Sequence, residues 1–319
     1  MSTAATTVVR SIDRRAILQR YGLLISFSIL VVVLSLLSDR FLTLSNITNV
    51  LRQASINGIV AVGMTLVILI GGIDLSVGSV LALAAVVAAS LMKQGLPVFL
   101  VIPLALGVGA GLGMINGLII TRGRIPPFIA TLGMLTVARG LTLMYTQGQP
   151  VTKLPESFRF IGAGVLGSIP MPIIVAGLTF LIGHILLTRT RLGEYIYVLG
   201  DNPVAARLAG VATNRMTVLV YAISGLCAAL AGLVLIARLD SAQPVIGQGY
   251  EFNAIAAVVV GGTSFAGGEG SLAGTLLGAL FIETINNGMN LLNVSSLWEQ
   301  VVKGAVIALA LLFYKAINR

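Results

Sequence analysis

Charged residues are scarce in this sequence of 319 residues, because Asp, Glu, Lys and Arg together make up only 10% of it. A soluble domain carries about 25% charged residues, so the composition excludes an ordinary soluble protein. Hydrophobic residues make up 57%, and the mean hydropathy is +1.01. The apolar runs are continuous and lack the two-residue alternation of barrel strands. We therefore expect an all-α, polytopic membrane protein.

Cysteine and histidine are nearly absent, with one residue of each type. The single cysteine, Cys227, excludes an internal disulfide. The single histidine, His184, gives no basis for a Ser/His/Asp triad, and no His, Cys or carboxylate cluster has the spacing of a metal site. We therefore expect no catalytic residue and no bound metal in this chain.

Nucleotide-binding motifs are missing as well. The glycine-rich run at 107–113 follows no strand, and the run at 261–270 lacks the Lys-Ser/Thr ending of a phosphate loop. The glycines of the first run are expected instead to let two helices approach closely. The chain is predicted to bind no cofactor, so any ATP that drives it must be bound by a partner.

The apolar runs predict about ten transmembrane helices within a single domain that covers residues 1–319. Their approximate bounds are 21–37, 56–70, 77–92, 98–120, 128–145, 173–187, 216–236, 252–260, 272–289 and 297–314. The segments between them are predicted to be polar. One of them, at 38–55, is expected to hold an amphipathic piece around Ile47 to Leu51, and a long polar loop ends near residue 169.

The positions of the basic residues predict the orientation in the membrane. With the N-terminus inside, the cytoplasmic segments hold twice as many Lys and Arg residues as the outer ones, as the positive-inside rule requires. Both termini, including the tail at 1–19, are then cytoplasmic, and so is a polar segment at about 189–215. These flanking residues account for the net charge of +9, so we expect lipid and no nucleic acid as a partner.

The polar segment contains a short helix signal. Asn202 suits the N-cap, Pro203 the first helical position and Gly210 the position after the helix end. The predicted helix has about two turns, too short to span a bilayer. Its exposed residues are expected to be mostly small, namely Ala205, Ala206 and Ala209, with one cation, Arg207. Two interpretations remain open at this point, an ordinary loop helix or a docking helix for a cytoplasmic partner. The segment consists of Asn202, Pro203, Val204, Ala205, Ala206, Arg207, Leu208, Ala209 and Gly210.

Polar residues inside the apolar segments form a second candidate set. Asp74 lies in a predicted turn, where we expect it to cap the third span near the cytoplasmic boundary, and Glu283 is expected to pair with a nearby amide. Gly267 and Gly268 are predicted to form a second tight turn. Five amides provide either hydrogen bonds between helices or a wet lining for a polar uncharged solute, and sequence alone leaves both open: Asn57, Asn116, Asn253, Asn286 and Asn287.

Two regions of the chain show a weak internal repeat at a separation of 196 residues. Asn57, Gly71, Gly72 and Gly78 recur as Asn253, Gly267, Gly268 and Gly274. By the predicted topology both copies run in the same direction, which is not an inverted repeat of the kind common in transporters.

Three stretches together resemble one family of transport proteins. They are AVGMTLVILIGGIDLSVGS from Ala61 to Ser79, TRLGEYIYVLGDNPVAARLAGV from Thr190 to Val211, and ARLDSAQPVIGQGYEFNAIAAVVVGGTSFAGGEGS from Ala237 to Ser271. The sequence is similar there to the permease subunits of ribose-type monosaccharide ABC importers, and the similarity extends from about Phe41 to the end of the chain.

The resemblance implies a homodimer of ten-helix permeases with the type II ABC importer fold in the bacterial inner membrane. A cytoplasmic ABC ATPase would bind ATP and Mg²⁺, and a periplasmic binding protein would deliver the sugar. The segment from Asn202 to Gly210 would be the coupling helix that docks on the ATPase. Alternatives from other classes are a related permease for an autoinducer or nucleoside, an ion-driven secondary transporter that uses Asp74 and Glu283, and an intramembrane enzyme, for which no catalytic set is visible.

Overall fold

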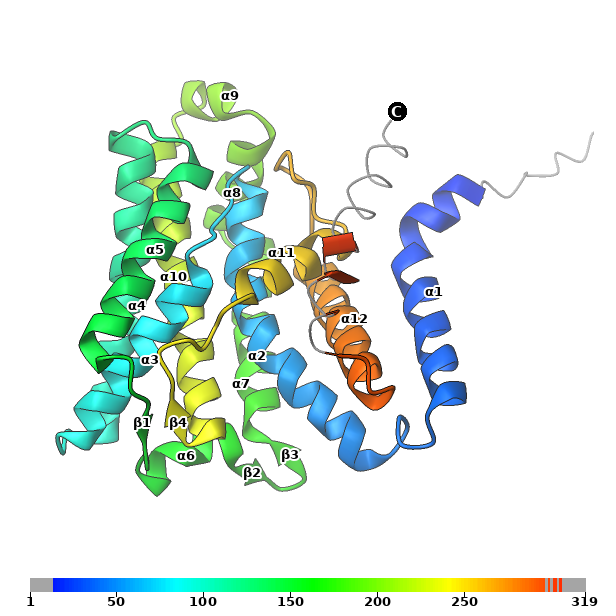
Figure 1. Ribbon diagram of the computed structural model, residues 1–319. Helices are drawn as coiled ribbons and strands as arrows, with labels where there is room; N and C mark the ends of the chain where they lie inside the picture. Colours follow the sequence, from blue (N-terminus) through cyan, green and yellow to red (C-terminus); the bar gives the residue numbers. More distant parts are fainter. Residues whose placement is uncertain (1–13, 296–297, 299–300, 303, 306–319) are drawn as a thin grey trace, which may run out of the picture.

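The computed structural model describes residues 14–295, 298, 301–302 and 304–305. Helices dominate this part of the chain (Figure 1). They are α1 (Arg14–Leu37), α2 (Leu44–Leu69), α3 (Val77–Lys93), α4 (Val98–Arg122), α5 (Pro127–Thr146), α6 (Glu156–Ala163), α7 (Met171–Arg189), α8 (Arg191–Asp201), α9 (Pro203–Leu208), α10 (Thr213–Leu239), α11 (Tyr250–Val260) and α12 (Leu272–Leu291). The strands are two residues each: β1 (Val151–Thr152), β2 (Val165–Leu166), β3 (Ile169–Pro170) and β4 (Ser241–Ala242).

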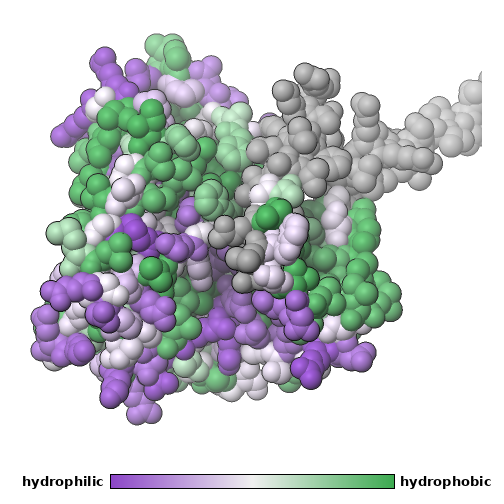
Figure 2. Space-filling view, in the orientation of Figure 1, coloured by the Kyte–Doolittle hydropathy of each residue, from purple (hydrophilic) through white to green (hydrophobic). Residues whose placement is uncertain are grey.

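The helices form a bundle with α2 and α10 at its centre. The apolar windows of α2 and α10 are 83% and 72% buried, whereas those of α4, α5 and α7 are 22–28% buried. These five helices are long and apolar enough to cross a membrane. Figure 2 shows hydrophobic side chains over the middle of one face of the molecule and hydrophilic ones gathered at its two ends. A hydrophobic belt between two polar ends is what a lipid bilayer requires of a spanning bundle.

The glycines of α4 set how closely it packs on α10, the most extensive helix pair in the bundle. A Cβ atom at Gly109 would overlap the backbone of Gly225, and one at Gly113 would overlap the carbonyl of Tyr221. Gly107 and Gly111 have open space where a Cβ would lie. The expected close approach is therefore made by the face of α4 that carries Gly109 and Gly113. These two glycines are four residues apart, a spacing that places residues on the same side of a helix.

Gly113→Ala is expected to lower the thermal midpoint of the detergent-solubilised protein by several degrees, because α4 and α10 must separate to accommodate the methyl group. The matched control is Gly111→Ala on the same helix, which meets no atom and adds helix propensity. Thermal unfolding followed by gel filtration measures both variants. Equal midpoints for the two would contradict the close packing described here.

The N-terminal ends of α3 and α11 lie close together inside the bundle. The loop before α11 brings Gly247 so close to Gly78, near the start of α3, that a Cβ at either glycine would overlap the other's carbonyl. Arg139 of α5 holds this loop by donating to the carbonyls of Pro244 and Ile246 at 2.8 and 2.9 Å. The buried carboxylate of Glu251, in the first turn of α11, also lies against Gly78. Carboxylates near helix N-termini offset the positive end of the helix dipole.

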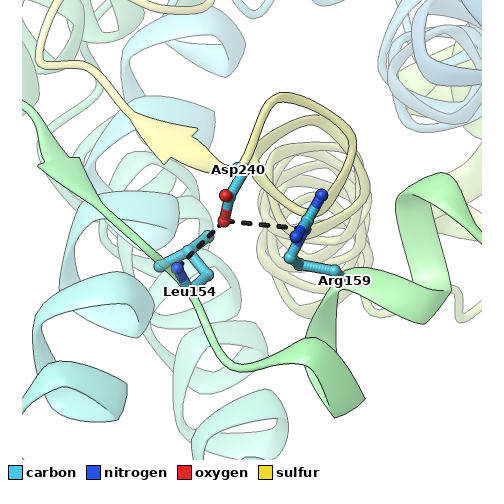
Figure 3. A network of polar contacts seen from close by, with 3 residues as sticks. All are labelled: Leu154, Arg159 and Asp240. Atoms are coloured by element: carbon cyan, nitrogen blue, oxygen red, sulfur yellow. Dashed lines mark hydrogen bonds and ion pairs between the residues drawn. The ribbon is translucent and has the colours of Figure 1, made fainter.

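The ends of the bundle differ in structure. At one end α8 and α9 project, and at the opposite end α6 and the four short strands close the bundle (Figure 1); we call these the α9 end and the α6 end. At the α6 end β1 pairs with β4, and Asp240 accepts a hydrogen bond from the Leu154 amide at 3.0 Å (Figure 3). Asp240 also lies 3.6 Å from the Arg159 guanidinium. Both side chains of this ion pair are partly exposed, so the pair contributes little to the free energy of unfolding and serves mainly to orient the two side chains.

Each of the first nine predicted spans lies on a helix of the structure, and the tenth, at 297–314, falls mostly outside the described residues. Three expectations need correction. The second helix begins at Leu44, well before the predicted position, since its polar first turns continue directly into the apolar run. The loop predicted to end near residue 169 contains α6 and three strands. The polar segment at 189–215 holds a second helix, α8, before α9.

Candidate functional site

The short helix of the polar segment forms where the sequence predicts it. The Asn202 side-chain oxygen accepts hydrogen bonds from the amides of Val204 and Ala205, each at 3.0 Å, which satisfies two of the free donors at the helix start. Pro203 occupies the first turn, and Gly210 follows the helix with a φ of +84°. Such a left-handed position suits glycine. The cap, the proline and the glycine together make α9 a rigid projection.

The exposed surface of α9 includes the predicted Ala205, Arg207 and Ala209, but two branched apolar side chains dominate it. Leu208 and Val204 are 84% and 70% exposed, whereas Ala206 is completely buried. The expectation that Ala206 is exposed is therefore wrong. Residues four apart share one face of a helix and the residue midway between them lies opposite, so Val204 and Leu208 point outward when Ala206 packs inward. Exposed apolar side chains that lie together on a protein surface often mark a site of contact with another protein, so this pair is a candidate contact surface.

The helix α8 connects α9 to the bundle. Thr190 caps α8, and its inner face is anchored by the buried side chains of Ile196 and Leu199. At its last turn, Gly200 lies so close to the Leu69 carbonyl that no Cβ would fit. Earlier in the helix, the Tyr197 hydroxyl donates to the Gly270 carbonyl at 2.9 Å. Partial burial raises the pKa of Tyr197, which keeps this donor protonated.

The contact under α8 joins the two glycine-rich turns of the chain. The Gly268 amide donates to the Leu69 carbonyl at 2.9 Å, and Gly267 lies beside Gly71. Gly267 and Gly268 have φ values of +91° and +73°, so both need the conformational freedom of glycine. The two copies of the weak internal repeat therefore meet at this point. The end of α2, the turn before α12 and the last turn of α8 form one contact, which we call the turn junction.

Asp74 lies in the turn after α2, as predicted. Ser76 is the N-cap residue of α3, and the Asp74 carboxylate accepts a hydrogen bond from the Ser76 backbone amide at 3.0 Å, so Asp74 satisfies a free donor at the helix start without being the N-cap residue itself. The Asp74 side chain is 1% exposed and accepts hydrogen bonds from the Ser76 hydroxyl at 2.6 Å and the Ser224 hydroxyl of α10 at 2.9 Å. Asn116 of α4 donates to the same Ser76 hydroxyl at 2.9 Å. Asp74 is thus a buried link between the turn, α4 and α10.

The five candidate amides fall into separate groups. Asn57 of α2 donates to Glu283 at 3.1 Å, and Asn286 donates to the other Glu283 oxygen at 3.3 Å. The predicted pairing of Glu283 with an amide is therefore confirmed for Asn286. Asn287 instead exchanges hydrogen bonds with Asn46, at 2.7 and 2.9 Å. The structure thus places Asn57 and Asn286 together and keeps the remaining amides apart, with Asn116 beside Ser76 and Asn253 on α11.

Comparison with known proteins gives a consistent result. Residues 46–311 match the family described as the branched-chain amino acid transport system / permease component. The chain belongs to this permease family. It is 47% identical to the ribose import permease protein RbsC of Escherichia coli (strain K12) over 314 residues, which cover 97% of this chain and 98% of that protein. No solved structure was found to match it.

Two further relatives of the permease extend the comparison. The ribose import permease protein RbsC of Bacillus subtilis (strain 168) is 50% identical over 93% of this chain and 92% of its own length. The D-allose transport system permease protein AlsC of Escherichia coli (strain K12) is 40% identical over 94% of this chain and 93% of its own length.

Sequence reasoning missed several polar residues of the permease that the structure places near the amides. Asn46 and Asn49 lie in the first turns of α2, ahead of the predicted span, and Arg52 follows them on the same helix. Arg238, in the last turn of α10, donates to the Asn49 side chain at 3.0 Å. Their signal was a helix start, since Thr43 caps the helix by accepting from the Asn46 amide. Among the described residues, no group of three or more His, Cys, Asp or Glu side chains is arranged to hold a metal ion.

Proposed function

We propose that this chain is the transmembrane subunit of an ATP-driven importer that moves a monosaccharide, such as ribose or a similar pentose or hexose, across the bacterial inner membrane. The α9 helix carries this proposal, since it projects from the bundle with an apolar face and is fixed to the turn junction through α8. The relatives whose names refer to ribose and D-allose support a sugar as the solute. An autoinducer or a nucleoside is the alternative cargo for the same fold.

The proposed assembly contains two copies of the permease, each with ten membrane helices in the type II importer arrangement and both termini in the cytoplasm. Each copy docks on a cytoplasmic ATPase, which binds ATP and Mg²⁺, and receives sugar from a periplasmic binding protein at the α6 end. The segment at 189–215, which holds α8 and α9, is the ATPase contact. The chain then needs no nucleotide site of its own.

Movement of α9 would reach the bundle through α8 and the turn junction. When the ATPase domains close, α9 moves with them, and α8 carries the displacement to the end of α2 and the turn before α12 because Gly200 leaves no gap between α8 and Leu69. A cavity of about 240 Å³, lined in part by Gly71, Arg207 and Tyr221, lies between α9 and the turn after α2. This space would let the turn shift without forcing side chains into a close-packed core.

The pathway for the solute is proposed to run along the amides Asn57, Asn116, Asn253, Asn286 and Asn287, centred on α2 and α12. The side-chain oxygens of Asn57, Asn253 and Asn286 are buried without a hydrogen-bond partner within the described part of the chain. Buried polar atoms without partners cost free energy. Passing water or sugar hydroxyls would satisfy them.

The test is reconstitution in proteoliposomes with the ATPase and the binding protein. The proposal predicts D-ribose uptake that requires ATP and all three components, with no uptake driven by a proton or sodium gradient alone. Uptake that persists without ATP or without the ATPase would contradict it and favour an ion-driven transporter. A binding protein that selects another polar solute would change the cargo and leave the mechanism in place.

A further inference from the structure

A cluster of charged side chains lies among the pathway amides, in contact with two of them. Arg52 comes from α2, Arg238 from the last turn of α10 and Glu283 from α12. The Arg238 guanidinium donates to the Asn49 side chain at 3.0 Å, three residues before Arg52 on α2. It also lies within electrostatic range of Tyr250 and Glu283, so four helices contribute to one polar region. Charged residues inside a spanning bundle are costly and mark functional sites more often than structural ones.

The cluster has hydrogen-bonding capacity that the described side chains do not use. The Arg52 Nε is buried and has no partner among the described residues, and the same holds for the side-chain oxygens of Asn57 and Asn286. Glu283 joins these two amides to the cluster, since both donate to its carboxylate. The region therefore offers a guanidinium donor and two amide acceptors within one group of packed helices.

This mixture of donors and acceptors matches a neutral polyhydroxyl ring. Each sugar hydroxyl accepts a hydrogen bond from a guanidinium and donates one to a carboxylate or amide oxygen. Hydrogen bonds to charged groups are stronger than those between neutral groups, so a few of them can hold a sugar that has left its binding protein. Neither an apolar solute nor a simple ion of a single sign would satisfy both kinds of group at once.

We infer that Arg52, Arg238 and Glu283 form a sugar-contacting site at the α6 side of the pathway, which receives the hydroxyl groups of an uncharged monosaccharide during transport. This inference rests on the proposed function and adds the residues and the chemistry of the contact. The site acts on the solute after the binding protein has docked, so it affects the sugar moved in each cycle and leaves docking and ATPase activation intact.

The experiment compares Arg52→Gln and Glu283→Gln with Arg40→Gln, an exposed arginine in the turn before α2 that serves as the matched control. Each variant is reconstituted with the ATPase and the binding protein, using D-ribose as the probe. D-ribose uptake and ATP hydrolysis are measured in the same proteoliposomes. We expect both cluster variants to move at least about tenfold less sugar per ATP hydrolysed, while binding-protein-stimulated ATPase activity stays within about twofold of wild type in all three.

The possible outcomes separate this inference from the proposed function. Unchanged sugar per ATP in both cluster variants, with normal uptake by wild type, would overturn the sugar-contacting site alone. Uptake and stimulated ATPase activity that fall in parallel would also overturn it, since that result assigns the residues a purely structural role. A wild-type protein that shows no ATP-driven uptake would overturn both the proposed function and the inference that rests on it.

Discussion

Replacing Leu208 with aspartate should reduce binding-protein-stimulated ATP hydrolysis and sugar uptake by at least about tenfold, while the permease still assembles in the membrane. Leu208 is 84% exposed and contributes to no core in the isolated chain, so the substitution has little to disrupt within the bundle. If the partner ATPase buries this side chain, its apolar surface contributes about 1.5–3 kcal/mol to docking. A buried unpaired charge would add a further penalty, and each 1.4 kcal/mol corresponds to about a tenfold change in affinity.

The matched control for this variant is Leu208→Met, which conserves volume and apolar character and should retain most of the activity. Copurification of the ATPase with each variant separates docking from catalysis. Normal ATPase stimulation and normal copurification with Leu208→Asp would contradict the docking role of α9. Ala206→Glu is a poorer test than the sequence suggests, because Ala206 is fully buried and a charge there would damage the packing of α9 itself.

Replacing Gly200 with valine should uncouple sugar transport from ATP hydrolysis. The new Cβ would overlap the Leu69 carbonyl and the Gly268 amide, so α8 must move away from the turn junction. We expect the ATPase to remain bound through α9, and sugar moved per ATP hydrolysed to fall by at least about tenfold. Uptake and ATP hydrolysis in the same proteoliposomes measure this ratio.

Gly177→Val serves as the matched control, since Gly177 lies in α7 and meets no atom where a Cβ would be placed. Gel filtration of both variants tests assembly. A Gly200→Val protein that elutes as wild type and transports with the normal ratio would contradict the transmission of force through α8.

The α9 helix shows which part of the site could be predicted from sequence. Its cap, its proline and its terminal glycine act through hydrogen bonds within a few residues, so the local pattern at 202–210 was sufficient. Which face of α9 is buried could not be predicted, because that depends on how the chain packs around Ala206. The preceding helix, α8, was missed although Leu192, Ile196 and Leu199 have helical spacing. The start of α8 is hard to recognise in the sequence because α8 follows the apolar helix α7 almost directly.

The buried polar contacts show where sequence reasoning fails. The partners of Asp74 include Ser224, 150 residues away, and Asn116 reaches Ser76 across 40 residues. No local pattern predicts such contacts. The apolar runs, by contrast, predicted the position of each described span within several residues, except for the start of α2. The amphipathic piece around Ile47 to Leu51 belongs to this start, but its polar residues separate it from the apolar run in sequence, and the cap at Thr43 marks where the continuous helix begins.

Site-directed crosslinking from α9 tests the proposed mechanism with a single variant. The chain has one cysteine, Cys227, which is buried, so a Leu208→Cys variant carries a single exposed thiol among the described residues. With the whole importer in inside-out membrane vesicles, we predict that a short thiol-directed photocrosslinker at this position captures the ATPase, and that ATP binding changes the yield. Labelling of residue 208 only from the periplasmic side, or no capture of the ATPase in any nucleotide state, would contradict the account.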